Sequence, residues 1–493
     1  MPQLLPILNT RFHGQESYSP AAGAPYSLLP FRFIELDTDR YVVSNFVGEH
    51  YVLPRSVLHQ LIQHELTAES IDYDELKSRH FLFDADSRVA LDLVAVKYRT
   101  KQQLLSHFTA LFIFVVSLRC DHSCPYCQVS RQSADRHAFD MSSEHADHAI
   151  DFMFQSPAPT IKVEFQGGEP LLNFSLIQHI VLKTKERNQT HGRQVEFVIA
   201  TNLVFLTEDV LSFCGEHGIC FSTSLDGPRE LHNRNRPRPG ADSYELATEG
   251  IRRIRDRLGH DRVAALMTTT EESLHQPREI IDEYVRQGFD AIFLRSISPY
   301  GFAVKTGYSD RYGVENWLEF YRTALDYIID LNHAGRPFRE EYTSLLLRKI
   351  LTPFPTGYVD LQSPAGIGIS CLVFNYDGGI YASDEARMLA EMGDQTFRLG
   401  HLRENSYEEV MLSPVLIETL ENAMTEGMPM CSDCGFQPYC GSDPVHHHAT
   451  QGDVVGFKPI SSFCGKNMGV LRHVFQLLED NPRAAAVLTS WIQ

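Results

Sequence analysis

The chain has 493 residues, 43% hydrophobic and 22% charged, a composition typical of a globular protein long enough for two or three domains. Its 44 basic and 63 acidic residues give a formal net charge of −19, which argues against non-specific nucleic-acid binding. The apolar run at 111–118 is too short to cross a bilayer, and the first residues lack the charged leader and long apolar core of a signal peptide. We therefore expect neither a nucleic-acid partner nor a membrane partner.

The first hundred residues predict a small domain of their own. Residues 1–25 read as irregular, and strand-like runs follow at 31–36, 41–45 and 49–53. Helical patterns over 54–64 and 73–78 complete a winged-helix-like unit, which we assign to residues 1–100. Two interpretations remain open for this unit: a peptide-recognition module, or a cap that binds no ligand.

From residue 111 onward, strand-like and helical segments alternate. The expected strands span 111–118, 161–166, 196–201, 219–225, 263–269 and 291–297. The helical patterns between them cover 142–155, 175–188, 207–217, 243–258 and 276–287. Six such βα units predict a parallel sheet, either open or curled into a partial (β/α)6 barrel. We place this core at 105–310 and a third region, with helices at 314–332, 339–351 and 470–478, at 311–493.

Residues that carry chemistry follow the ends of these strands. Three cysteines come after the first strand, the run Gly167-Gly168-Glu169-Pro170 after the second, and Asn202 after the third. Ser224 and Asp226 lie at the end of the fourth. Active sites of parallel α/β folds lie at the carboxyl ends of the strands, so these residues are expected to meet in one site.

The three cysteines are Cys120, Cys124 and Cys127, in a C-x3-C-x2-C arrangement. Three thiolates on one tight loop can hold three corners of a [4Fe–4S] cluster and leave the fourth iron open to a small chelating molecule. The alternatives are a zinc knuckle or buried structural thiols. Zinc sites usually supply four protein ligands, and the sequence offers no fourth cysteine nearby.

This spacing, with an aromatic residue before the third cysteine and a following GGEP segment, resembles the radical S-adenosylmethionine (SAM) superfamily. The resemblance implies that SAM chelates the open iron and is cleaved reductively to a 5′-deoxyadenosyl radical. It also implies roles for seven residues. Gly167, Gly168 and Glu169 would contact the methionyl amino group. The ribose and the carboxylate region of SAM would be bound by Asn202, Ser224, Asp226 and Arg236.

A second set of cysteines lies near the carboxyl terminus: Cys431, Cys434, Cys440 and Cys464, spaced C-x2-C-x5-C-x23-C. Four thiolates suit a closed zinc site or a second [4Fe–4S] cluster, and spacing alone does not decide between them. The block resembles the SPASM extension of peptide-modifying radical SAM enzymes, which implies an auxiliary [4Fe–4S] cluster.

The SPASM pattern is incomplete in this chain. Asp384 stands where the family carries a second cysteine, and Pro444 replaces another. We therefore predict one auxiliary cluster rather than two, with Cys371 as a buried thiol. Asp384 and Glu385 stand where related enzymes can carry an acid–base residue, although surface carboxylates in a turn fit equally well.

We assign no chemical role to three further features of the sequence. The run 446–448 is three consecutive histidines, which point in different directions on a regular backbone and cannot easily share one ion. We expect them in a loop. Cys214 and Cys220 fit a helix end and a buried strand.

The segments CDHSCPYCQVSR, KVEFQGGEPLLNF and NRPRPGADSYE resemble His-Xaa-Ser system radical SAM maturases over nearly the whole chain. This resemblance implies an α/β partial (β/α)6 radical SAM barrel with a C-terminal SPASM/twitch-like iron–sulfur domain. It implies modification of a ribosomally made peptide with His-Xaa-Ser repeats, a partner maturase, an electron donor such as flavodoxin or ferredoxin, and a cytoplasmic setting.

Two other functions remain open. One is a sulfatase-maturase-like enzyme that makes formylglycine, against which the missing first auxiliary site counts. The other is a non-catalytic iron–sulfur scaffold that binds peptide, against which the intact GGEP segment counts.

Overall fold

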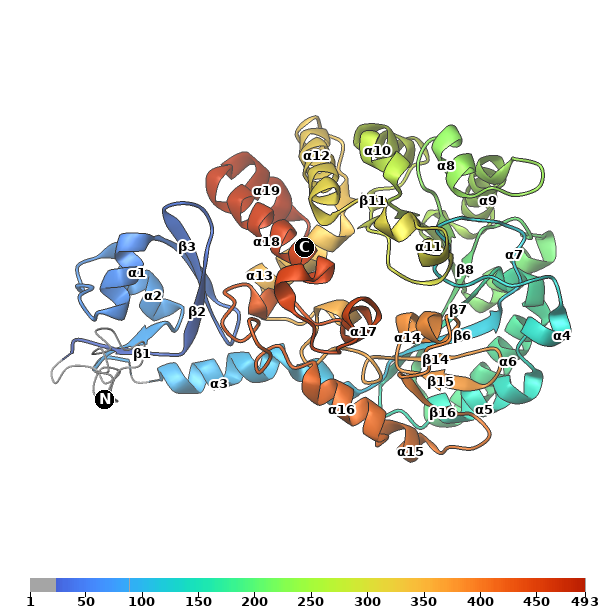
Figure 1. The fold of residues 1–493 in the computed structure, drawn as a ribbon, viewed down its shortest axis with the longest axis horizontal. Coiled ribbons are helices and arrows are strands. Elements are labelled where there is room, and N and C mark those ends of the chain that lie inside the picture. Colours follow the sequence, from blue (N-terminus) through green and yellow to red (C-terminus); the bar gives the residue numbers. More distant parts are fainter. Residues whose placement is uncertain (1–23, 88, 493) are drawn as a thin grey trace, which may run out of the picture. The chain divides into compact units, whose positions relative to one another are not determined.

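A computed structural model describes residues 24–87 and 89–492, so the irregular stretch expected at 1–25 lies almost wholly outside the described residues. The chain folds as two compact units (Figure 1). Unit 1 comprises residues up to Lys101 together with 433–438, and unit 2 comprises 102–432 and 439–493.

Unit 1 is built on a three-stranded antiparallel sheet in which β2 (Phe31–Glu35), β3 (Arg40–Asn45) and β4 (His50–Pro54) are neighbours in chain order. Its helices are α1 (Arg55–Ile62), α2 (Ile71–Ser78) and α3 (Ala90–Lys101), and β1 (Ser27–Leu28) pairs with β5 (Leu82–Phe83). Val43, Leu58 and Leu76 bury their side chains in the core between this sheet and the first two helices. The expected three strands and two helices are confirmed, and α3 was not anticipated.

Unit 2 is organised around a nine-stranded sheet of order β12-β10-β9-β8-β7-β6-β14-β15-β16. From β6 to β12 every neighbouring pair is parallel. The bounds are β6 (Leu111–Ser117), β7 (Thr160–Gly167), β8 (Gln194–Thr201), β9 (Cys220–Ser224), β10 (Val263–Thr268) and β12 (Leu294–Arg295). The predicted α/β fold with a parallel sheet is confirmed.

The third region of the chain continues this sheet. Strand β14 (Cys371–Phe374) pairs in parallel with β6, and β15 (Gly379–Tyr381) and β16 (Arg398–His401) follow in antiparallel order. Strand β6 is therefore an interior strand of the sheet, and its side chains are buried on both faces, which explains its unbroken apolar sequence. Phe112 and Phe114 face the larger apolar core, whereas Ile113 and Val115 face the smaller one.

Helices cover the sheet between its strands, and Figure 1 shows several of them along its outer side. Those following the first strands are α5 (Ser143–Met153), α6 (Phe174–His191), α7 (Glu208–His217), α8 (Arg229–Asn235), α9 (Ser243–Leu258) and α10 (Pro277–Arg286). Those after the core are α11 (Gly301–Lys305), α12 (Val314–His333), α13 (Glu341–Leu351), α14 (Asp384–Ala390), α15 (Tyr407–Met411), α16 (Pro414–Asn422), α17 (Pro444–Gln451), α18 (Ser462–Asp480) and α19 (Pro482–Ser490). A short helix, α4 (Arg136–Phe139), precedes them. Gly218 ends α7 in the left-handed conformation, as its position after a helical pattern predicts.

The structure corrects two expectations. The sixth strand, expected as one run over 291–297, is split into β11 (Ala291–Ile292) and β12, because β11 pairs instead with β13 (Arg339–Glu340). The histidines at 446–448, expected in a loop, lie in α17, whose amino end is capped by Asp443. Among the described residues, no helix combines the length and the hydropathy that crossing a bilayer requires.

Candidate active site

The loop after β6 carries Cys120, Cys124 and Cys127, and all three thiols line one cavity of about 280 Å³ in unit 2. The carboxyl ends of the neighbouring strands supply much of the remaining wall. Its members include Gln166, Gly167, Gly168, Thr201, Asn202, Ser222, Ser224, Arg236, Thr268, Arg295 and Asp384. The rule that sites lie at strand ends therefore holds for this sheet.

Three thiols on one short loop line a single cavity, and three thiolates can hold three corners of a [4Fe–4S] cluster. Ligation would hold the thiols deprotonated. Burial raises the pKa of Cys124 to about 12, so this thiol is protonated without such a partner.

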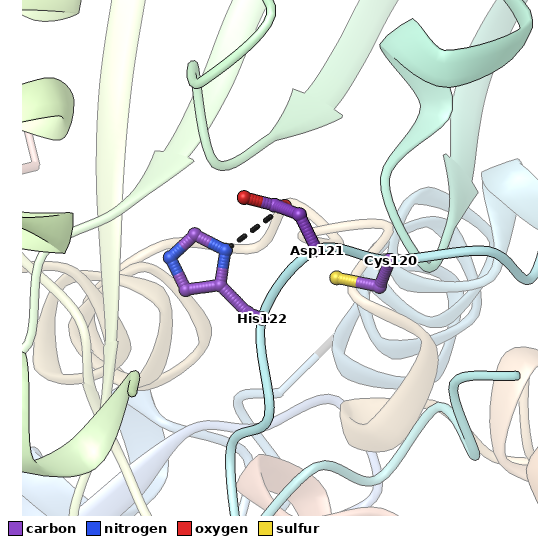
Figure 2. Close-up of side chains that lie close together, drawn as sticks. All are labelled: Cys120, Asp121 and His122. Carbon is purple, nitrogen blue, oxygen red and sulfur yellow. Dashed lines mark hydrogen bonds and ion pairs between the residues drawn. The ribbon is translucent and has the colours of Figure 1, made fainter. Parts of the chain in front are cut away.

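The trio of Cys120, Asp121 and His122 braces the loop. Figure 2 shows Asp121 and His122 turned toward each other, with His122 Nδ1 3.1 Å from the carboxylate. Asp121 also accepts from Asn202 Nδ2 at 2.8 Å and Arg238 Nε at 3.0 Å. The second ring nitrogen of His122 lies 2.8 Å from Ser243 Oγ. Both residues are thus occupied by protein partners that fix the loop to β8 and α9.

The two glycines of the GGEP segment are required by close backbone contact. A Cβ atom on Gly167 would overlap the carbonyl oxygen of Ser117, and one on Gly168 would overlap that of Arg119. Gly167 also has φ +134°, a conformation that glycine adopts without strain. Gly168 N donates to the Ser117 carbonyl at 2.8 Å. The segment therefore holds the start of the cysteine loop by its backbone.

Glu169 is fully buried and does not line the cavity. Its carboxylate accepts from Leu171 N at 2.9 Å, Thr201 Oγ1 at 2.7 Å and Asn202 N at 2.8 Å. Burial raises its pKa to about 7, although these hydrogen bonds oppose the shift. Glu169 joins the ends of β7 and β8 behind the cavity wall.

Asp226 is also fully buried behind the wall. It forms a bidentate ion pair with Arg236, with Nε 2.9 Å and Nη2 3.1 Å from its oxygens, and accepts from Tyr126 Oη at 2.6 Å. Burial alone would raise the pKa of Asp226, but Arg236 and His232 lower it overall. The aromatic residue before the third cysteine thus locks the loop to the end of β9.

The sequence-predicted residues therefore divide into two groups. Those in the wall of the cavity are Cys120, Cys124, Cys127, Gly167, Gly168, Asn202, Ser224, Arg236 and Asp384. Those outside it include Glu169 and Asp226, which brace the wall, and Glu385, which lines a neighbouring cavity. Arg295 lines both cavities but is absent from the residues predicted from the sequence, although its place at the end of β12 follows the same strand-end rule.

Three of the C-terminal cysteines interact within unit 2. Burial raises the pKa of all three thiols; Cys440 adds electrostatically to the shift at Cys431 and Cys464, Cys431 adds to the shift at Cys464, and Lys458 opposes the shift at each. Asn467 Nδ2 lies 3.7 Å from Cys440 Sγ. Cys434 belongs to the segment 433–438 of unit 1, where it forms an isolated parallel bridge with Phe33.

The other candidates are occupied by the protein. Cys371 is buried in β14, and burial raises its pKa well above the usual range. His446 and His447 pair with the hydroxyls of Ser462 and Ser461, and His448 pairs with Asp394. Each of the three histidines therefore has a partner of its own. Cys214 is buried in α7, and Cys220 begins β9.

Residues 114–291 match the family model of the radical SAM superfamily. These residues form a radical SAM domain. The protein is therefore an enzyme. Most residues that line the cavity around Cys120, Cys124 and Cys127 belong to the matched range, whereas Arg295, Asp384 and Met388 come from beyond it.

The radical SAM domain and its extensions resemble three described proteins. A cysteine-type anaerobic sulfatase-maturating enzyme of Clostridium perfringens is 20% identical over 312 residues, which cover 61% of this chain and 79% of that enzyme. The structure of anSMEcpe with bound AdoMet superposes with a TM-score of 0.64 at 16% identity, covering 78% of this chain and 99% of the other. The structure of Streptococcus suis SuiB bound to precursor peptide SuiA gives 0.52 at 14% identity, covering 88% and 98%. These likenesses show a common fold.

Proposed function

We propose that this enzyme cleaves SAM reductively and uses the resulting 5′-deoxyadenosyl radical to modify a ribosomally synthesised peptide. The observation that carries the proposal is the convergence of Cys120, Cys124 and Cys127 with the strand ends on one cavity, most of whose wall belongs to the radical SAM domain. A [4Fe–4S] cluster on these thiolates would supply the open iron and the electron for cleavage.

The residues of the wall then bind and orient SAM. Gly167 and Gly168 present backbone atoms where a side chain would block approach, which suits contact with the methionyl amino group. Arg236 commits two nitrogens to Asp226 and keeps Nη1 for the SAM carboxylate. We assign Asn202 and Ser224, which line the cavity, to the ribose. We assign Glu169 and Asp226 to SAM binding only indirectly, through the residues they hold.

The peptide substrate is supported by the relatives. One of them is named for the maturation of sulfatases, and another was crystallised with a precursor peptide. The specific proposal is a peptide with His-Xaa-Ser repeats, made in the cytoplasm, with a partner maturase and a flavodoxin or ferredoxin as electron donor. It rests on the sequence segments quoted above.

We further propose one auxiliary [4Fe–4S] cluster on Cys431, Cys434, Cys440 and Cys464. The electrostatic influence of Cys440 on Cys431 and Cys464 supports it. Asp384 and Glu385 are the candidates for moving a proton during the reaction. Burial, together with Asp360 and Asp384, raises the pKa of Glu385 to about 7, where a carboxyl can both give and accept a proton near neutrality.

A second candidate function is the conversion of a sulfatase cysteine or serine to formylglycine. The similarity to sulfatase-maturating enzymes favours it. The presence of Asp384 in place of the cysteine expected for a first auxiliary site counts against it.

The test is anaerobic reconstitution with iron and sulfide, followed by reduction in the presence of SAM. We expect 5′-deoxyadenosine by chromatography and iron equivalent to two [4Fe–4S] clusters per chain. Mass spectrometry then compares a His-Xaa-Ser repeat peptide with a sulfatase-derived peptide. Absence of 5′-deoxyadenosine from cluster-replete protein would refute the radical reaction, whereas modification of the sulfatase peptide alone would favour the second candidate.

A further inference from the structure

A second cavity of about 440 Å³ lies in unit 2 and adjoins the first. Arg295 lines both cavities, and the consecutive residues Asp384 and Glu385 line the first and the second respectively. Six aromatic side chains contribute to the walls of the second cavity: Phe293, Tyr312, Trp317, Tyr342, Tyr358 and Phe463. A molecule in this space would therefore lie next to SAM bound in the first cavity.

Arg295 lies at the boundary between the two cavities. Its side chain is 41% exposed, and the residue lines both cavities. The guanidinium makes no hydrogen bond to any described residue, and its ion-pair partner is Glu385 at 3.9 Å. A guanidinium carries five N–H donors in a fixed fork and accepts nothing. The free donors at this boundary suit an acceptor oxygen, such as a peptide carbonyl.

Three carboxyl groups also line the second cavity, those of Asp360, Glu385 and Asp443. Unlike Arg295, they need a hydrogen-bond donor or a positive charge from the bound molecule. Burial and mutual repulsion raise the pKa of Asp360 to about 6 and those of the other two to about 7. Lys466 is the second resident cation, and its Nζ lies 3.3 Å from Ser296 Oγ. With Asp310, four carboxyl groups line the cavity against two cations, so a positive or N–H-donating guest would relieve the repulsion.

Trp317 supplies a further unused donor. Its side chain is 3% exposed, it lines the cavity, and its Nε1 has no hydrogen-bond partner among the described residues. Buried indole N–H groups usually find a partner. The aromatic walls also suit a cation, because ring faces attract positive charge.

We propose that the second cavity binds one residue of the substrate polypeptide. Arg295 donates to its backbone carbonyl at the boundary, and Asp360, Glu385 and Asp443 accept from a positively charged or N–H-donating side chain. This inference rests on the proposed function, because it places the residue beside the site where SAM would be cleaved.

The test measures binding of three blocked amino acids to the reconstituted holoenzyme with SAM: the N-acetyl methylamides of lysine, leucine and glutamate. Saturation-transfer NMR gives a dissociation constant for each. We expect the lysine probe to bind at least about 10-fold more tightly than the glutamate probe. Arg295→Met should weaken all three by about 10-fold, since each loses hydrogen bonds to a charged group. Asp360→Asn should reduce the preference for lysine over leucine.

Arg339→Met is the matched control, because Arg339 is 42% exposed and lines neither cavity. It should leave all three constants unchanged. Equal binding by wild type and Arg295→Met, or failure of every probe to bind wild type, would overturn the proposal. A preference for leucine or glutamate would overturn its side-chain part. Formation of 5′-deoxyadenosine without any probe is measured in the same protein, so a failure of SAM cleavage is recognised separately.

Discussion

The two cavities of unit 2 are assembled differently. Most of the wall of the first comes from the last residues of consecutive parallel strands and from the loop after β6, and buried ion pairs and hydrogen bonds brace that wall from behind. The second is built from residues between 293 and 466, drawn from strand ends, loops and helices, and its charged groups have few partners. This difference fits the two proposed roles, in which the first cavity binds SAM and the second binds one residue of the substrate polypeptide.

The largest expected effect is at the cysteine loop. Cys124→Ala leaves two thiolates for the cluster, so we expect SAM cleavage to fall at least about 100-fold, below detection, with loss of the loop's iron. Cys220→Ala is the control, since Cys220 is a partly exposed thiol at the start of β9, outside both cavities. Iron analysis and 5′-deoxyadenosine are the readouts. Retained cleavage in Cys124→Ala would break the assignment of the first cavity.

Removal of two C-terminal thiols should separate the auxiliary site from the first cavity. The double variant Cys431→Ala/Cys440→Ala leaves two thiolates, so it is expected to remove the auxiliary cluster and halve the iron content, while SAM cleavage without substrate persists. Electron paramagnetic resonance of the reduced protein should lose one of two signals. Zinc at this site, or an unchanged iron content, would show that the four cysteines hold no cluster.

The bracing of the first cavity predicts a large stability effect at a single methyl group. Gly168→Ala forces a Cβ into the carbonyls of Arg119 and Leu118, and we expect unfolding free energy to drop by more than about 3 kcal/mol. Gly427→Ala, where the nearest atom is an ordinary 3.9 Å away, should change it by less than about 0.5 kcal/mol. Thermal unfolding of the two holoproteins checks this, and similar melting temperatures would contradict the close packing.

The smallest expected effect is a change in how the unfolding free energy depends on pH, and it comes from Glu169. Its folded pKa of about 7 lies above the ordinary value of 4.5, so the folded state binds an extra proton between these pH values. The unfolding free energy should therefore fall as pH rises from 4.5 to 7, by up to about 3 kcal/mol from this residue. Glu169→Gln removes that contribution. Denaturant unfolding across this window should give a flatter pH slope for the variant, and parallel slopes would refute the shift.

The sequence predicted the first cavity well because each of its features is local. The C-x3-C-x2-C spacing and the glycines after β7 are legible in a few residues, and the strand-end rule assembles them. What it did not predict is which side chains face the ligand. Glu169 and Asp226 turn away because Asn202 N and Arg236 satisfy them, and such pairings depend on tertiary packing.

The second cavity was not predicted, because Asp360, Asp443 and Lys466 carry no local pattern that singles them out. The splitting of the sixth strand has the same origin. Phe293 interrupts a run that looks continuous, since β11 finds its partner β13 more than forty residues later. The histidines of α17 were predicted to lie in a loop because no strand or helix pattern leads into Pro444, the residue at which their helix begins.

The pairing of β14 with β6 bears on how this protein can be recombined. The strand that leads into the cysteine loop is hydrogen-bonded on one side by β7 and on the other by residues 371–374. A chimera that exchanged everything after residue 310 would replace a structural neighbour of the catalytic strand along with any specificity it meant to transfer. Grafts that retain 371–381 as part of the recipient are the ones expected to preserve the cluster loop, so the exchangeable unit here is smaller than a domain.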